Sequence, residues 1–115
     1  MSNEEDLRNL EIGIEQAKKA VAKMDSINKL TNNKDFKDII LEGYFEKEAS
    51  RLVLLRADPA MQTEQDQNNI NNAITAIGHL RLYLMSVLQT GRAAANAIHE
   101  DELTREEILA EDLSE

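Results

Sequence analysis

The chain of 115 residues contains a single proline, Pro59, and only four glycines. Most tight turns use the backbone freedom of glycine or the fixed φ of proline, so this chain has to consist of a few long elements. Aromatic residues make up 3% and Trp is absent, which disfavours a β-sheet and leaves a core of Leu, Ile, Val, Ala and Met. These features predict an all-α protein.

The first expected helix covers residues 4–31. Apolar residues recur from Leu7 to Met24 at alternating spacings of 3 and 4, the a/d pattern of a packed helical seam. This seam has two interpretations. We favour packing against the other helices of the same chain, because so short a chain needs that face for its own core. The alternative is a coiled coil with a second copy, in which the self-association residues are Leu7, Leu10, Ile14, Val21 and Met24.

The second expected helix lies between Asn33 and Pro59, the stretch with the densest apolar run. Asn32 or Asn33 can cap its start, and the residue before Pro59 is pushed out of helical conformation, which ends it. Helical spacing predicts a single apolar stripe, widened by Phe45 and Val53. The stripe consists of Phe36, Ile39, Ile40, Tyr44, Ala49, Leu52 and Leu55.

The third expected helix runs from Thr63, which resembles the start of a capping box, to about His99. Gly91 is expected to end or kink it. With the second helix it should form an antiparallel hairpin across residues 57–62, with the first helix alongside in a three-helix bundle. Its apolar face consists of Ile70, Ala73, Ile74, Ile77, Leu80, Leu84, Val87 and Leu88.

The last sixteen residues are strongly acidic. Residues 100–115 hold eight acids and one base, a net charge of −7 out of −9 for the whole chain. Thr104 matches the start of a capping box, which predicts a short helix after a charged hinge. We therefore divide the chain into a helical bundle domain, 1–99, and an acidic C-terminal tail, 100–115. The tail either solubilises the protein or docks into a partner's groove, with Leu103, Ile108, Leu109 and Leu113 as anchors.

No stretch of the sequence carries recognisable catalytic or ligand-binding chemistry. Cys is absent, and His79 and His99 lack metal-ligand spacing to carboxylates. There is no glycine-rich phosphate loop, so we predict no enzyme activity, no cofactor and no metal. The acidic balance argues against nucleic acid as a partner. No apolar run reaches about 18 residues, and the acidic start MSNEED is unlike a signal peptide, so we predict no membrane association.

Two segments resemble small helical proteins encoded by tailed bacteriophages. They are NKDFKDIILEGYFEKEASRLVLLRADPAM and NAITAIGHLRLYLMSVL, about half of the chain. The resemblance implies a phage structural or morphogenesis protein in the host cytoplasm or the virion, a homo-oligomer with a phage-encoded protein partner. The alternative is a small acidic inhibitor or modulator of a host protein. The matching positions are Phe36, Gly43, Tyr44, Phe45, Ala49, Arg51, Leu52, Asp58, Pro59, Ile77, Gly78, Leu80, Arg81 and Leu84.

Overall fold

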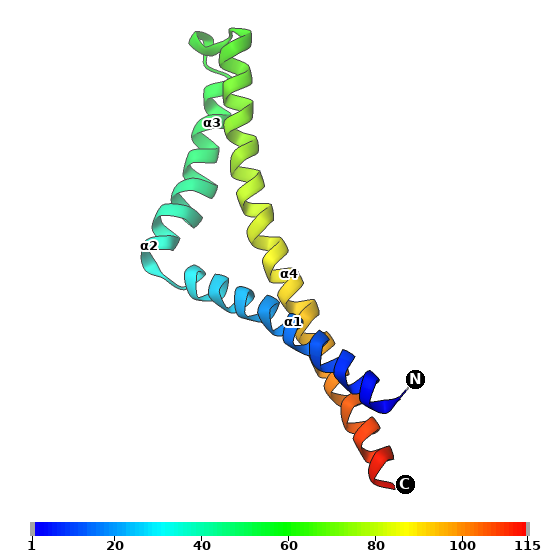
Figure 1. The fold of residues 1–115 in the computed structure, drawn as a ribbon. Helices are drawn as coiled ribbons and strands as arrows, with labels where there is room; N and C mark the ends of the chain where they lie inside the picture. The colour runs from blue at the N-terminus through cyan, green and yellow to red at the C-terminus, as the bar shows by residue number, and fades with distance from the viewer. Residues whose placement is uncertain (1, 115) are drawn as a thin grey trace. The chain divides into compact units, whose positions relative to one another are not determined.

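The computed structural model describes residues 2–114, and Figure 1 follows them from α1 to the end of α4. Glu115, the last residue of the predicted tail, lies outside the described residues. No strand occurs in residues 2–114, so the all-α prediction is confirmed. None of the helices in this range combines the length and the apolar character of a membrane span. The elements are α1 (Asn3–Thr31), α2 (Lys34–Phe36), η1 (Lys37–Glu48), α3 (Ala49–Arg56), η2 (Pro59–Met61) and α4 (Glu64–Ser114).

The chain divides into two compact units. Unit 1 joins the residues up to Ser26 with those from Val87 onward, and unit 2 is Ile27–Ser86. Both α1 and α4 contribute to each unit. This division differs from the expected boundary between residues 99 and 100. A single three-helix bundle is not confirmed and stays a prediction.

Unit 2 is built on a hairpin in which α3 packs against the first half of α4. Its buried centre consists of Leu52 from α3 with Ile70 and Ile77 from α4. Around them lie partly buried apolar side chains from η1, α3, the turn and α4. These are Tyr44, Phe45, Ala49, Leu55, Met61, Ala73 and Ile74.

The hairpin turn is closed by side-chain hydrogen bonds. Asp58 ends α3 and caps η2, where its Oδ1 accepts from the Ala60 N–H at 2.9 Å. The amide groups of Gln62 and Gln67 both donate to the carbonyl of Arg56, at 2.9 and 3.1 Å. These bonds satisfy carbonyl groups that a helix end leaves without a partner. The glutamines therefore fasten the start of α4 to the end of α3.

The helix before the turn contains an unusual stretch of π-helix. The predicted cap is confirmed, because Asn33 Oδ1 accepts from the Phe36 N–H at 3.0 Å. From Lys37 to Glu48, however, the chain forms η1, whose hydrogen bonds span five residues instead of four. The wider turn changes which side chains face inward. Ile39, placed on the apolar stripe by the α-helical period, is 67% exposed, so that prediction was wrong.

The prediction that Val53 widens the apolar stripe was also wrong. Val53 lies on α3 one residue after the buried Leu52, and about half of it is exposed. Successive residues of an α-helix point about 100° apart, so the two side chains cannot share the face that covers Ile70. Phe45, the other residue expected to widen the stripe, does pack against the core.

Gly43→Ala is expected to destabilise unit 2 by about 1–3 kcal/mol. A Cβ at Gly43 would lie 2.9 Å from the carbonyl oxygen of Asp38 in η1. That oxygen belongs to the backbone and cannot rotate away, so the helix has to change its geometry. Thermal unfolding followed by circular dichroism, with amide exchange in residues 37–56, measures the effect.

Gly78→Ala is the matched control for this prediction. Gly78 lies on α4 in the same unit, and a Cβ there meets no atom within 4 Å. Replacing glycine by alanine inside a helix should then stabilise unit 2 by about 0.5–1 kcal/mol. Equal shifts of the two variants in the same direction would show that the Asp38 contact is unimportant.

The expected hinge before the acidic tail is absent from α4, which continues without a break from Glu64 to Ser114. Thr104 does not cap a new helix; its hydroxyl donates to the carbonyl of Glu100 at 3.1 Å, within the helix. Gly91, which was expected to end or kink the helix, does not end it and lies within α4. The physical reason is that this part of α4 packs on α1 within unit 1, so the contacts override the local capping signal.

Candidate protein-binding surfaces

Unit 1 is an antiparallel pair formed by α1 and the last part of α4. Three contacts define the direction, since residue numbers rise on α1 as they fall on α4. Asn3 Nδ2 donates to Asp112 Oδ1 at 2.7 Å. A Cβ at Gly13 would lie 3.8 Å from Asp101, and one at Gly91 would overlap Met24. The two helices approach closely at Met24, where a Cβ opposite it at Gly91 has no space.

The seam predicted from Leu7 to Met24 forms the inner face of this pair. Ile14 is 3% exposed, and Leu7, Leu10, Val21 and Met24 are half-buried. The structure thus supports the intramolecular interpretation. A second copy can pair through these five side chains only if α4 of the same chain leaves them.

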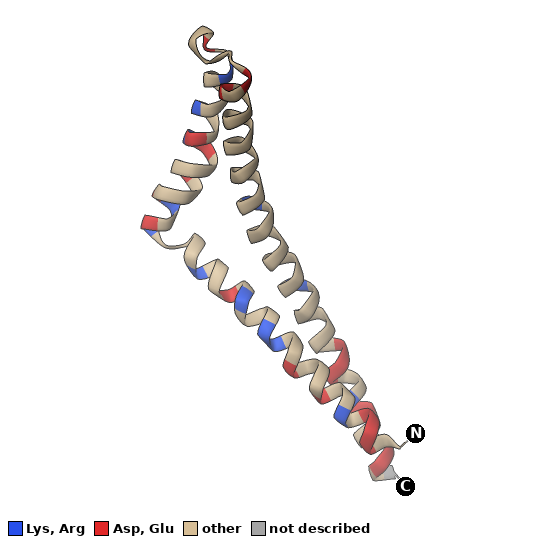
Figure 2. Cartoon of the chain, turned by 45° about the horizontal axis from the view of Figure 1, so that its top comes forward, with Lys and Arg blue, Asp and Glu red and all other residues tan. Residues whose placement is uncertain are grey.

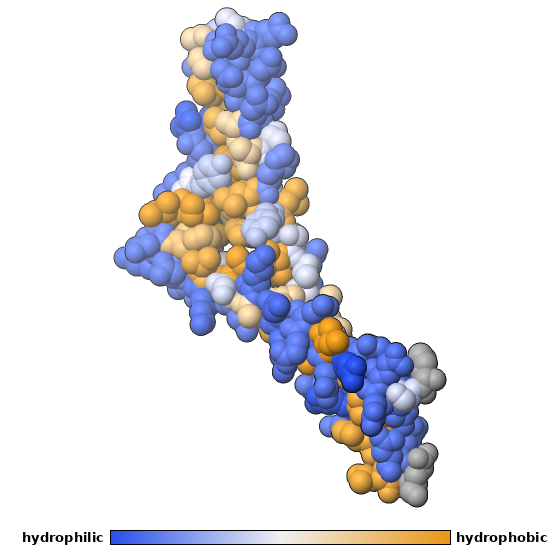
Figure 3. Space-filling view, viewed as in Figure 1, coloured by the Kyte–Doolittle hydropathy of each residue, from blue (hydrophilic) through white to orange (hydrophobic). Residues whose placement is uncertain are grey.

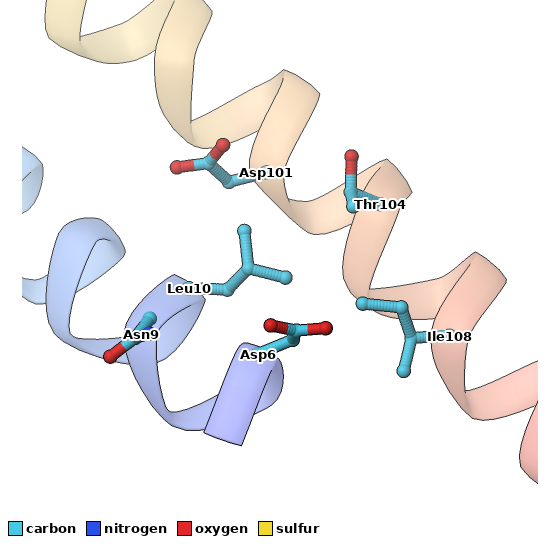
Figure 4. Close-up of a pocket in the computed structure, with 6 residues that line it drawn as sticks. All are labelled: Asp6, Asn9, Leu10, Asp101, Thr104 and Ile108. Carbon is cyan, nitrogen blue, oxygen red and sulfur yellow. The ribbon is translucent and has the colours of Figure 1, made fainter. Parts of the chain in front are cut away.

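A shallow depression lies at the acidic end of unit 1. Figure 4 shows Leu10 directed from α1 toward α4, with Asp101 and Ile108 on either side. Ile108, predicted as an anchor for a partner, therefore faces α1 of its own chain. Among residues 2–114, no group of three or more His, Asp or Glu side chains is arranged to hold a metal ion. The depression is lined by Asp6, Asn9, Leu10, Asp101, Thr104 and Ile108.

The other three predicted anchors lie on the outer side of α4. Leu103 and Leu109 are about half exposed, and Leu113 is 89% exposed. Leu109 and Leu113 are four residues apart and so lie on one face of the helix. Acidic residues surround them, and Figure 2 shows these acids concentrated on the last turns of α4. The end of α4 therefore offers an apolar strip within an acidic surface.

Removing residues 100–115 is expected to unfold more than the residues removed. Asp101, Ile108 and Asp112 pack on or bond to the first half of α1, and an isolated helix of that length is marginal in water. Leu113→Ser, at an exposed site, should change stability by less than about 0.5 kcal/mol. Circular dichroism of both variants tests this; if the truncated chain keeps its full α1 helicity, α4 does not support α1.

The largest group of exposed apolar side chains on one helix segment is in unit 2. Leu80, Leu82, Tyr83 and Met85 on α4 are all exposed. In Figure 3 the start of α4 near the turn is hydrophilic, whereas apolar surface lies further along the unit. A second exposed area is a shallow depression on the outside of η1 and α3. It is lined by Phe45, Glu46, Ala49, Ser50, Val53 and Leu54.

The sequence pattern predicted one apolar face for each helix. Leu80 was wrongly expected on that buried face, and Leu54, Leu82, Tyr83 and Met85 were not predicted to be surface residues. The signal was nevertheless present in the sequence. Seven of the nine residues from Leu80 to Leu88 are apolar, and Leu52–Leu55 is an unbroken apolar run. A helix with apolar residues on most of its sides is usually buried against other elements.

Comparisons of the chain with protein-family models, with curated proteins and with solved structures find no match.

Proposed function

We propose that this chain is a non-enzymatic structural or morphogenesis protein of a tailed phage that acts by self-association and protein binding. The observation that carries this proposal is the exposure of apolar side chains. Among the described residues, twelve large hydrophobic side chains are exposed, whereas five hydrophobic side chains are buried. Contiguous exposed apolar surface on a protein commonly marks an interaction site.

The phage setting rests on the resemblance of residues 33–61 and 72–88 to small phage helical proteins. It places the protein in the host cytoplasm or in the virion, with a phage-encoded protein as partner. The three-helix bundle expected from the sequence, with its hairpin core, is the fold of one chain and belongs to this proposal. Association would then cover the apolar sides that each helical pair leaves exposed.

The test is the mass of the full chain in solution, measured by light scattering after size exclusion at several concentrations. A discrete oligomer that persists on dilution supports self-association. A monomer of 13.0 kDa at every concentration would contradict it. Helicity measured on the same samples shows whether association requires unfolding.

The charge of unit 1 favours a second candidate function, a small acidic modulator of a host protein. Residues 4–15 of α1 hold five acids and one base, and residues 100–112 of α4 hold seven acids and one base. The antiparallel pairing gathers these net charges of −4 and −6 at one end of unit 1. Such a surface can imitate nucleic acid toward a basic protein. A monomer whose binding to a basic protein falls steeply with salt would favour this function.

A further inference from the structure

We infer that two copies of this chain associate through unit 2, with the exposed segment Leu80–Met85 of α4 contacting the same segment of the second copy. This inference rests on the proposed self-association and names the surface that performs it. The seam from Leu7 to Met24 is not that surface, since α4 of the same chain covers it.

The exposed residues of this segment lie on more than one side of α4. Leu82, Tyr83 and Met85 point in different directions, because successive residues are about 100° apart. A single docked peptide helix covers one stripe of its partner and would leave the other sides in water. A second copy brings both helices of its own hairpin. Packing of two hairpins, as in a four-helix bundle, can therefore surround the segment.

The net charges of the two units favour unit 2 over unit 1 as the place where two copies make contact. Unit 2 has seven bases and eight acids, a net charge of −1, whereas unit 1 has six bases and fourteen acids, a net charge of −8. Two unit 1 surfaces repel each other, whereas two unit 2 surfaces do not. Between Asp66 and Glu100, α4 carries only two charged residues, Arg81 and Arg92.

The residue types of this segment also suit a contact between two copies. A symmetric dimer places identical patches against each other. Tyr, Met and Arg, which protein interfaces favour, are all present at Arg81, Tyr83 and Met85.

The first experiment compares Leu82→Glu with Leu113→Glu in the full chain by sedimentation equilibrium. Both leucines are exposed on α4, and both variants add one negative charge. Leu82→Glu would bury two unpaired carboxylates in the dimer, so we expect at least about a 100-fold weaker association. Leu113→Glu should leave the association constant within about threefold of the parent chain. Equal association constants for both variants would overturn the inference.

The second experiment uses the absence of Cys from the natural chain. Tyr83→Cys is expected to give a disulfide-linked dimer under mild oxidation, and Leu113→Cys is expected to stay monomeric on a non-reducing gel. If Leu82→Glu loses helicity, the cross-linking of Tyr83→Cys still tests the proposed surface. If the parent chain dimerises but Tyr83→Cys does not cross-link, the surface is wrong and self-association stands. If the parent chain never dimerises, the proposed self-association fails as well.

Discussion

Gly91→Ala is expected to destabilise unit 1 by about 1–3 kcal/mol, because the new methyl group has no space. A Cβ at Gly91 would lie only 2.3 Å from the Cβ of Met24 on α1. Each Cβ is fixed to its own backbone, so no rotation of a side chain relieves the overlap. The helices have to separate, which exposes Ile14 and Val87. Denaturant unfolding combined with amide hydrogen exchange in α1 measures the effect.

Gly13→Ala is the matched control in the same pair of helices. Its Cβ would lie 3.8 Å from Asp101 Oδ2, an ordinary van der Waals distance. The substitution raises helix propensity as much as Gly91→Ala does, and should stabilise α1 by about 0.5–1 kcal/mol. The difference between the two variants thus isolates the contact with Met24. If Gly91→Ala were also stabilising, the close approach of α1 and α4 would be refuted.

The two glycines illustrate what the sequence can and cannot predict. The spacing from Leu7 to Met24 identified the inner face of α1, because burial on one side of a helix leaves a periodic pattern. The pattern does not say which helix covers that face. Gly91 and Gly78 look alike in the sequence, and only the partner helix distinguishes a required glycine from a replaceable one.

Predictions from local sequence patterns were wrong where contacts with a distant helix, or a π-helical period, determined the structure. Thr104 has the residues of a capping box, but a cap forms only if the chain leaves the helix there, and α1 supports a continuous α4. Ile39 was placed by the α-helical period, which does not hold in the π-helical stretch. The candidate binding residues Leu82 and Tyr83 were not predicted, because only one apolar face was expected on each helix. This part of α4 has apolar residues on more than one side.

Leu52→Ala is expected to destabilise unit 2 by about 2–5 kcal/mol, as large-to-small changes in a packed core do. Leu52 is 6% exposed and is one of three residues at the buried centre, so a cavity there removes contacts with both helices of the hairpin. So small a core has little other apolar contact to compensate. The measurement is the free energy of unfolding from urea titration, at a concentration low enough to keep the chain monomeric.

Leu54→Ala is the control that separates core packing from the outer surface. The two leucines are two residues apart on α3 and lose the same atoms, but Leu54 is 74% exposed. In dilute solution its substitution should change the free energy of unfolding by less than about 0.5 kcal/mol. A similar loss for both variants would mean that Leu54 is covered in the monomer. A loss for Leu54→Ala that grows with protein concentration would instead mean that association covers the outer side of α3, beside the depression that runs from Phe45 to Leu54.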